Sequence, residues 1–251
     1  MSEGSEESDT VEGCSCTGVS SLCTVTDGDN CECVESFGNF YTLGPSGHPI
    51  LNLDAVPYRL PLVECGAHCS CSVKCFNRTT QRGVNLPVEI RQTKAGLGAF
   101  LSASADAVPI EAGTFIALYA GEYLSTSEAR SRWQLESKDN YTLSLRLANA
   151  IIHIDPRYKG NVGRFFNHSC DPNCVILIVY WGGGWPRAAI FSKSIIQPSE
   201  ELTFDYGNAS GDQDAQDRVE GCVAEDDRPT LTKCLCGSVR CRGYMPFDSS
   251  L

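Results

Sequence analysis

Alternating and short apolar stretches along the middle of the chain predict a protein built mainly of β-strands. Val88–Arg91 alternates between apolar and polar side chains, and residues 114–119 form the short apolar run that is typical of a buried strand. Residues 140–147 alternate in the same way. Further apolar runs that we expect to be strands are 151–155, 175–180 and 188–191. The pattern therefore indicates a mainly β fold with few helices.

One segment carries the signals of a helix. Ser125 and Glu128 have the spacing of a capping box, in which each side chain satisfies a backbone N–H of the other residue. Arg130 and Arg132 come later in the segment, where the helix dipole favours positive charge. We expect a helix that runs through about Glu136 and packs on the edge of a sheet.

Two polar stretches contain too few apolar residues to build a core. Residues 1–12 are mostly Ser, Glu and Asp, and residues 208–232 are acidic, with scattered Gly and Ser and no periodicity. We expect the first to be a disordered tail and the second to be a flexible insertion. Cys222 lies in this insertion without an obvious partner, so its thiol is expected to be free.

Length and charge narrow the possible functions. With 251 residues, of which 42% are hydrophobic, the chain can bury one substantial core and smaller lobes. It has no apolar run of about 18 residues and no basic, then apolar, N-terminus, which argues against a membrane span and a signal peptide. The net charge of -11 argues against direct DNA binding. It fits either a basic partner or a surface that simply keeps the protein soluble.

The fifteen cysteines indicate metal sites. Their number is odd, and the pattern Cys-x-Cys occurs at positions 14/16, 31/33 and 69/71. Cysteines two residues apart pair poorly with each other but chelate one ion well. In a chain without a secretory signal we therefore favour zinc thiolates in a reducing compartment over disulfides. Nine of the cysteines precede residue 76, namely Cys14, Cys16, Cys23, Cys31, Cys33, Cys65, Cys69, Cys71 and Cys75.

Nine thiolates fill tetrahedral zinc sites only if some of them are shared. Three zinc ions need twelve bonds, which nine thiolates supply when three of them bridge two ions. Two separate four-cysteine sites with one spare cysteine are the alternative. In either case metal binding would take the place of a hydrophobic core for this part of the chain.

Residues 164–174, Arg-Phe-Phe-Asn-His-Ser-Cys-Asp-Pro-Asn-Cys, concentrate chemically active side chains in eleven positions. This composition suits irregular backbone folded around a polar ligand, although a polar turn with a structural cysteine is the simpler alternative. The segment resembles the signature of the SET-domain protein-lysine methyltransferases. Residues 201–206, Glu-Leu-Thr-Phe-Asp-Tyr, are similar to the second signature of that family. Cysteines 234, 236 and 241 are similar to its post-SET zinc segment.

The resemblance implies a SET fold of small curved β-sheets in which the signature loops form a knot-like crossing. It divides the chain into a pre-SET zinc cluster at 13–83, a SET catalytic domain at 84–207 and a post-SET zinc segment at 233–251. The nine N-terminal cysteines then resemble the triangular three-zinc cluster of the Suv39-like class. The fourth zinc ion is expected to be held by Cys170, Cys234, Cys236 and Cys241. Cys174 is the alternative to Cys170.

Site residues follow from the same resemblance. The family uses S-adenosylmethionine as methyl donor, and the expected cofactor contacts here are Gly96, Leu97, Gly98, Tyr158, Arg164, Phe165, Asn167, His168 and Tyr244. Leu97 stands where the family often has Trp, and an isolated Gly-x-Gly is usually just a turn. In the lysine channel, Tyr206 is expected to hold the amine, Tyr141 to orient it, and Phe204 to leave space for a second methyl group.

The resemblance implies a histone-lysine N-methyltransferase of the nucleus and chromosome, acting on the histone H3 tail in chromatin. Lysine 9 of histone H3 is favoured by the pre-SET cysteines. Residues 242–251 resemble the end of a SET domain fused to a mariner transposase, which suggests lysine 4 or lysine 36 of histone H3 instead. A zinc hydrolase is disfavoured because His-Glu-x-x-His is absent. A catalytically inactive, zinc-stapled chromatin-binding module is the main alternative.

Overall fold

The computed structural model describes residues 13–16, 23, 31–56, 60–83, 86–104, 106–135, 141–208 and 232–246. The predicted acidic tail and nearly all of the predicted insertion, including Cys222, lie outside these residues. Within them, short strands and turns predominate over helix, as the apolar pattern predicted. Among the described residues, none of the helices has the length and apolar character that crossing a membrane requires.

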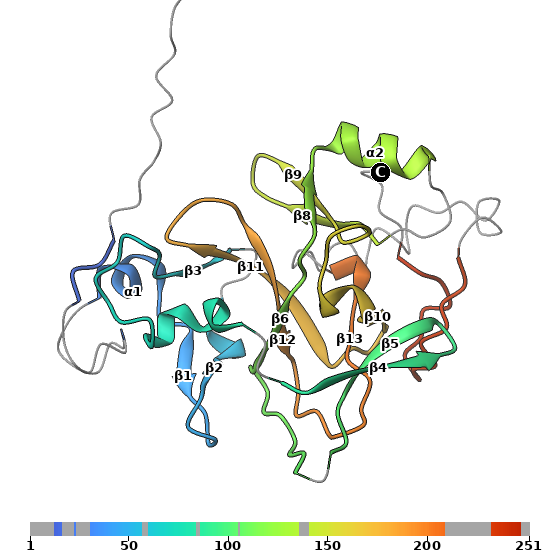
Figure 1. Ribbon diagram of the computed structural model, residues 1–251, viewed down its shortest axis with the longest axis horizontal. Helices are drawn as coiled ribbons and strands as arrows, with labels where there is room; N and C mark the ends of the chain where they lie inside the picture. Colours follow the sequence, from blue (N-terminus) through green and yellow to red (C-terminus); the bar gives the residue numbers. More distant parts are fainter. Residues whose placement is uncertain are drawn as a thin grey trace, which may run out of the picture.

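The N-terminal lobe contains little regular structure and lies at one end of the molecule (Figure 1). Its elements are α1 (Glu32–Phe37), β1 (Tyr41–Leu43), β2 (Pro49–Leu51), η1 (Leu53–Ala55), β3 (Leu62–Glu64) and η2 (Phe76–Arg82). Buried cysteines packed around Val34 form its interior, in place of a core of large aliphatic side chains.

The N-terminal lobe supplies one strand to the largest sheet of the described residues. That sheet has the order β3, β11 (Cys174–Trp181), β12 (Arg187–Ser192), β6 (Phe115–Leu118). β3 runs parallel to β11, and β12 is antiparallel to both of its neighbours. The two lobes therefore share one hydrogen-bonded sheet.

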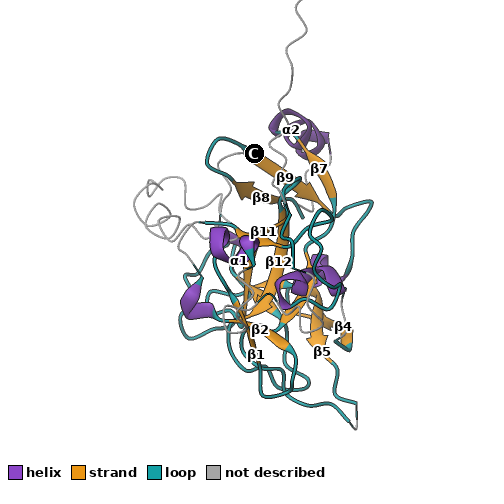
Figure 2. Ribbon diagram, turned by 90° about the vertical axis from the view of Figure 1, so that its left-hand side faces the viewer, coloured by secondary structure: helices purple, strands orange, loops and turns teal. Residues whose placement is uncertain are grey.

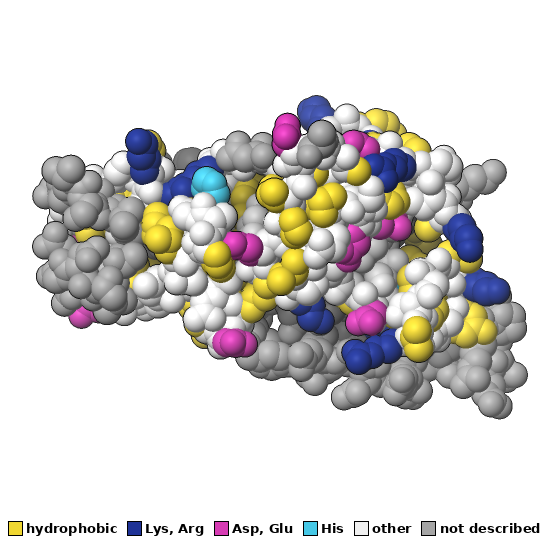
Figure 3. All heavy atoms as spheres, turned by 90° about the horizontal axis from the view of Figure 1, so that it is seen from below, with side chains coloured by type: hydrophobic (Ala, Val, Ile, Leu, Met, Phe, Trp, Pro, Cys, Tyr) yellow, Lys and Arg dark blue, Asp and Glu magenta, His cyan; other side chains and the backbone are white. Residues whose placement is uncertain are grey.

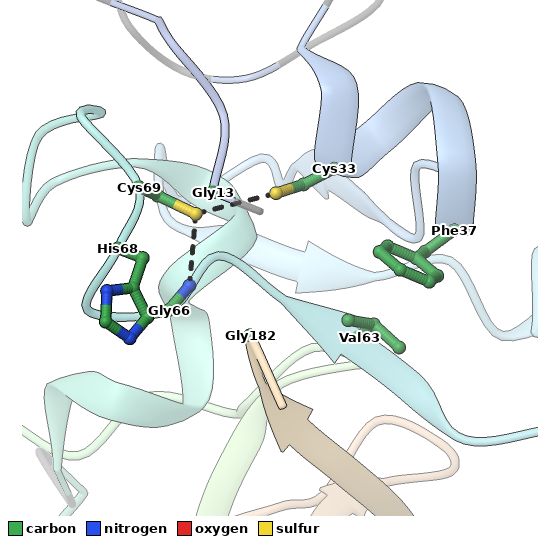
Figure 4. A pocket seen from close by; sticks show the side chains of 8 residues that line it. All are labelled: Gly13, Cys33, Phe37, Val63, Gly66, His68, Cys69 and Gly182. Atoms are coloured by element: carbon green, nitrogen blue, oxygen red, sulfur yellow. Dashed lines mark hydrogen bonds between the residues drawn. The ribbon is translucent and has the colours of Figure 1, made fainter. Parts of the chain in front are cut away.

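The backbones of the two lobes also pack closely against each other at their junction. Gly182 N–H donates to Glu64 O at 2.8 Å, and a Cβ at Gly66 would lie 2.6 Å from Trp181 O. Figure 4 shows this place, where a shallow pocket is lined by Gly66 and Gly182 from the two lobes and by Cys33 and Cys69. Only glycine lets the two backbones approach so closely.

Two smaller sheets and a helix complete the SET part. β4 (Val88–Thr93) and β5 (Gly96–Leu101) form a hairpin. β7 (Glu122–Leu124), β9 (Ile151–Asp155) and β8 (Leu143–Arg146) form a three-stranded sheet. Helix α2 (Thr126–Leu135) lies against this sheet (Figure 2), as predicted.

The predicted capping box is confirmed. Ser125 N–H donates to Glu128 Oε2 at 2.8 Å, and Glu128 N–H donates to Ser125 Oγ at 3.3 Å. The strand predicted at 140–147 is shorter, because regular pairing with β9 begins only at Leu143. An isolated Gly-x-Gly is typical of a turn, but here Gly96 and Gly98 lie on β5 and the turn is at residues 94–95. Their contact with the cofactor stays a prediction.

The signature segments cross next to the main hydrophobic core. η3 (Val162–Phe165) leads into β10 (Asn167–His168), which pairs in parallel with β13 (Thr203–Phe204), and η4 (Tyr206–Asn208) follows. The fully buried residues around the crossing include Phe166, Ile190 and Leu202. The signature segments are therefore held against a densely packed core.

Gly66→Ala is expected to lower the free energy of unfolding by about 1 to 3 kcal/mol, because the new methyl group meets backbone atoms that cannot move aside. Thermal or denaturant unfolding of both proteins measures the difference. Ala67→Ser, at the exposed neighbouring position, is the control and should leave stability almost unchanged. Equal stability of Gly66→Ala and the native chain would contradict the close junction.

Candidate active site and metal centres

The histidine of the first signature is buried at the crossing. His168 is 6% exposed, its Nδ1 accepts the backbone N–H of Tyr206 at 3.2 Å, and its Nε2 lies 3.3 Å from Cys170 Sγ. Burial lowers the pKa of His168 to about 4, even though Asp205 Oδ1 is only 3.6 Å from Nδ1. The imidazole is thus neutral near pH 7, with its proton on Nε2 facing the cysteine sulfur.

Aromatic side chains from three segments meet beside His168. The Phe204 ring lies 4.7 Å from that of Tyr206 and 6.1 Å from that of Tyr119. Tyr206 OH donates to Phe166 O at 2.8 Å, and Tyr119 OH donates to Tyr141 O. The structure therefore brings the three predicted lysine-channel residues together.

Tyr119 is a member of this group that was not predicted. It ends the apolar run 114–119 and was assigned to the core on that pattern. The sequence did contain one indication that Tyr119 is more than a packing residue. A buried tyrosine usually has a hydrogen-bond partner for its hydroxyl group. Burial raises the pKa of both Tyr119 and Tyr206. Both phenols accordingly stay protonated and leave this part of the site uncharged.

Arg164 stands next to the channel residues. Its guanidinium carbon lies 4.8 Å from the centroid of the Tyr141 ring and 5.5 Å from that of Phe165. Nη1 donates to Arg157 O at 3.2 Å. A cation over an aromatic face restrains both side chains, so Arg164 helps to hold Tyr141 in place.

Gly98 of β5 lies beside the first signature. Asn167 Nδ2 donates to Glu201 Oε1 at 2.8 Å and lies 3.4 Å from Leu97 O. A Cβ at Gly98 would be 2.5 Å from Glu201 Oε1 and 2.9 Å from Asn167 Nδ2. Gly98 therefore makes room for this pair, and two candidates of β5, Leu97 and Gly98, lie beside the candidate Asn167, which is distant in the sequence. Gly96 begins the same strand.

The remaining cofactor candidates are more exposed. The Tyr158 ring is 64% exposed and lies 5.5 Å from the Arg132 guanidinium of α2. Tyr244 is 41% exposed and forms a backbone bridge with Lys233 in the C-terminal segment. Their assignment to the cofactor stays a prediction.

Sulfur atoms gather in three overlapping groups in the N-terminal lobe. Within each group the sulfurs lie within 4.8 Å of one another: Cys14, Cys23, Cys31 and Cys65; Cys14, Cys33, Cys65 and Cys69; and Cys23, Cys65, Cys71 and Cys75. Because the groups share members, the sulfurs resemble a shared cluster more than two separate sites. Cys16 is the one predicted ligand outside these groups.

The surroundings of these cysteines fit a metal cluster. Arg78 is 9% exposed and its Nε donates to Cys71 Sγ at 3.3 Å, while Asn77 Nδ2 donates to Cys65 Sγ at 3.4 Å. Donors aimed at sulfur stabilise thiolates, which are the form that binds zinc. The described cysteines are all free of disulfides, as expected.

A fourth group joins the C-terminal segment to the first signature. It consists of Cys170, Cys234, Cys236 and Cys241, again within 4.8 Å of one another. Cys174 is 1% exposed and belongs to the hydrophobic core. The geometry thus favours Cys170 over Cys174. Arg242 strengthens the connection, since its N–H donates to Cys170 Sγ at 3.4 Å and its Nη2 donates to Asp205 Oδ1 at 2.7 Å.

Comparison with known proteins agrees with this geometry. A family model described as "SET domain" matches residues 107–207. The probable histone-lysine N-methyltransferase set-23 of Caenorhabditis briggsae is 36% identical over 75% of this chain and 74% of its own length. A histone-lysine N-methyltransferase of Schizosaccharomyces pombe named as H3 lysine-9 specific is 34% identical over 93% of this chain and 47% of its own.

Solved structures of histone-lysine methyltransferases are also similar to this chain. The methyltransferase domain of human SETMAR has a TM-score of 0.73 at 30% identity and covers 94% of this chain and 81% of its own. KRYPTONITE, solved with DNA, an H3(1-15) peptide and SAH, has a TM-score of 0.69 at 27% identity and covers 93% of this chain and 43% of its own. The chain spans less than half of the S. pombe protein and of KRYPTONITE.

A crossing of two signature strands beside a group of aromatic side chains, together with the cysteine groups and the matching family model, defines a SET-domain protein-lysine methyltransferase. The chain belongs to the family of SET-domain histone-lysine N-methyltransferases. Among these, its relatives are the Suv39-like and SETMAR enzymes.

Cys170→Ser is expected to reduce the bound metal by one ion per chain, because it removes one of four ligands that close a tetrahedral site. Metal analysis of the purified protein measures the loss. Cys174→Ser is the matched control; it adds a buried hydroxyl and costs some stability, but the metal content should stay that of the native chain. Metal loss on Cys174→Ser with none on Cys170→Ser would reverse the assignment.

Proposed function

We propose that this protein transfers methyl groups from S-adenosylmethionine to a lysine of the histone H3 tail, with lysine 9 of H3 favoured over lysine 4 and lysine 36. The observation that carries the proposal is the crossing of β10 and β13, which places Tyr206 and Phe204 against the Asn167–His168 segment. Support for the cofactor and for the H3 substrate comes from the ligands named for KRYPTONITE, and support for lysine 9 from the S. pombe relative.

The bound cofactor would supply an electrophilic methyl group on a positively charged sulfur. To accept such a methyl group the lysine nitrogen would need its lone pair, so the amine would have to be unprotonated. A free lysine has a pKa of about 10.4 and is almost entirely protonated at pH 7. A nearby positive charge and burial both lower that pKa, so the proton can leave to solvent without a dedicated base.

The residues of the channel align the amine and exclude water. Tyr206 OH is fixed by Phe166 O, and the Tyr119 hydroxyl is fixed by Tyr141 O, so both phenols are pre-oriented. Because burial keeps both phenols protonated, they do not add negative charge that would stabilise the ammonium form. In-line displacement then depends mainly on alignment.

We assign residues 13–83 to a pre-SET domain with three zinc ions, 84–207 to the SET domain and 233–251 to a post-SET segment with one zinc ion. All of the predicted ligands are thiolates, which are the donors that zinc prefers in structural sites. Zinc in the last group would tie the C-terminal segment to Cys170, two residues from His168. The zinc ions would therefore act as structural ties and take no part in methyl transfer.

We place the protein in the nucleus, on chromatin, as its proposed histone substrate requires. The acidic chain does not favour direct DNA binding. On the face in Figure 3, the Lys and Arg side chains of the described residues are interspersed with Asp and Glu and form no continuous basic patch among them. A catalytically inactive chromatin-binding module is the second candidate, but the complete set of channel residues favours an enzyme.

The central test is transfer of a labelled methyl group from S-adenosylmethionine to intact histones, with the modified lysine located by mass spectrometry. We expect modification of H3. Tyr206→Phe is the matched variant and should reduce the rate about a hundredfold, because it removes one fixed hydroxyl from the channel. No transfer by a zinc-loaded chain that binds the cofactor would favour the inactive module.

Phe204→Tyr is expected to shift the products toward monomethyl-lysine. Phe204 is 3% exposed and lies between Tyr119 and Tyr206, where a new hydroxyl could hold a water molecule beside the amine. Displacing that water for a second methyl group costs about 1 to 2 kcal/mol, or roughly tenfold in rate. Timed mass spectra of an H3 peptide should show di- or trimethyl product for the native chain. A native enzyme that stops at one methyl group under excess cofactor would refute this role.

A further inference from the structure

A buried arginine lies among the cysteines of the N-terminal lobe without a carboxylate partner. Arg78 of η2 is 9% exposed, and none of the described residues forms a salt bridge with it. A guanidinium group stays charged in proteins, and a buried charge is costly unless an opposite charge lies beside it. The negative charge that accompanies Arg78 must therefore come from another kind of group.

The contacts of the guanidinium identify that group. Nη2 donates to Gly66 O at 2.7 Å and lies 3.3 Å from Cys69 O, and Nη1 donates to Gln81 Oε1 at 3.3 Å. These three acceptors are neutral. Nε donates to Cys71 Sγ at 3.3 Å, and Cys71 is only 7% exposed. The sulfur of Cys71 is thus the one of these partners that can be an anion, as a thiolate.

A buried carboxylate of the same lobe, Glu64, is satisfied by other donors. Tyr41 OH donates to it at 2.7 Å, the Thr80 N–H and hydroxyl both donate at 2.9 Å, and Gln81 Nε2 donates at 3.0 Å. The Gln81 amide stands between the two charged groups, because its Oε1 accepts from Arg78. The guanidinium therefore faces the Cys71 sulfur and makes no direct contact with Glu64.

A zinc cluster of the proposed composition needs such a cation. Nine thiolates and three zinc ions leave a formal net charge of about -3, in a place where most of the cysteines are buried. A hydrogen bond from a positively charged donor draws electron density from a thiolate, which makes the sulfur a weaker target for protons and electrophiles. Asn77 Nδ2 donates to Cys65 Sγ at 3.4 Å, but this amide is neutral. Arg78 adds the positive charge.

We propose that Arg78 stabilises the Cys71 thiolate as a zinc ligand and thereby slows the loss of metal from the whole N-terminal cluster. The inference rests on the proposed function, since it takes the pre-SET zinc ions as present. Arg78 is a positioning residue here: it acts on the metal through Cys71. Its other N–H groups bind the carbonyls of Gly66 and Cys69, which holds the guanidinium in the orientation that faces the sulfur.

The test is the rate at which the zinc-loaded chain releases metal to an excess of a chromophoric chelator. Arg78→Met has a similar length but lacks the charge and the donors. It should release the cluster zinc about tenfold faster or more, the size that loss of a hydrogen bond to a metal ligand commonly produces. Arg78→Lys keeps the charge without the planar fork of donors and should give a smaller increase.

Arg82→Met is the matched control. Arg82 belongs to the same element, and its Nη2 donates to Lys74 O at 2.6 Å and to Cys75 O at 2.8 Å. None of its hydrogen bonds to described residues reaches a sulfur. This variant should release zinc within about twofold of the native rate.

A second measurement separates an effect on one sulfur from a loosened lobe. Brief labelling of the zinc-loaded chain with N-ethylmaleimide, followed by mass spectrometry of its peptides, gives the initial reaction rate of each cysteine. Arg78→Met should raise the rate at Cys71 severalfold more than the rate at Cys33, which belongs to the same buried cluster. If Arg78→Met does not fold, Arg78→Lys replaces it in both measurements and should change them in the same direction.

Three outcomes overturn the proposal. Equal release rates for Arg78→Met and the native chain would show that the guanidinium is not needed. An equal acceleration in Arg82→Met, or the same rise in labelling at Cys71 and Cys33, would indicate a general loosening of the lobe. Both outcomes leave the proposed function intact as long as the native chain holds its zinc. A native chain that holds no zinc in this lobe would instead contradict the proposed zinc cluster, and this inference with it.

Discussion

The short parallel pairing of β10 with β13 is the constraint on which the site depends. Only two residue pairs form it, Asn167 with Thr203 and His168 with Phe204, so it needs support from side chains. Asn173 supplies much of that support, because its Oδ1 accepts from Thr203 N–H at 3.0 Å and its Nδ2 donates to Glu201 O at 2.8 Å. One amide thus replaces the ladder hydrogen bonds that a longer pair of strands would have.

In part of the N-terminal lobe, a cluster of cysteines takes the place of an apolar core. One of the buried clusters of the N-terminal lobe consists chiefly of cysteines, and donors from η2 point to their sulfurs. The same element also reaches the other lobe: Thr80 Oγ1 donates to the buried Glu64 carboxylate at 2.9 Å and accepts from Trp181 Nε1 at 2.9 Å. Order in the cysteine cluster and order in the shared sheet are therefore physically coupled.

Much of this arrangement could be predicted from the chain, because it has local causes. The apolar runs located the strands of the core, and the capping box located α2 to within a residue of its start. The signature motifs gave the channel residues Tyr141, Phe204 and Tyr206 through a family resemblance. The structure brings these three residues together, and their catalytic roles stay predictions.

What the sequence did not reveal depends on contacts between distant segments. Parallel pairing of β3 with β11 joins residues more than a hundred positions apart and leaves no periodic signal of its own. In the sequence, Tyr119 could not be distinguished from an ordinary core residue. Its hydroxyl donates to Tyr141 O, and Tyr141 is separated from it in the chain by helix α2. Gly98 was predicted as a cofactor contact through the resemblance alone, and the sequence did not show that a side chain at this position would meet those of Asn167 and Glu201.

The sharing of a sheet between the lobes has a consequence for solubility. β3 covers one side of the last three residues of β11, Val179–Trp181. If the cysteine cluster lost its order, β3 would lose its anchor at Glu64 and Cys65. The end of β11, Val179–Trp181, would then lose its backbone partners on that side, and an unpaired strand edge is the kind of surface that pairs with other chains and aggregates. The N-terminal lobe thus also acts as a protective cover for the edge of the catalytic sheet.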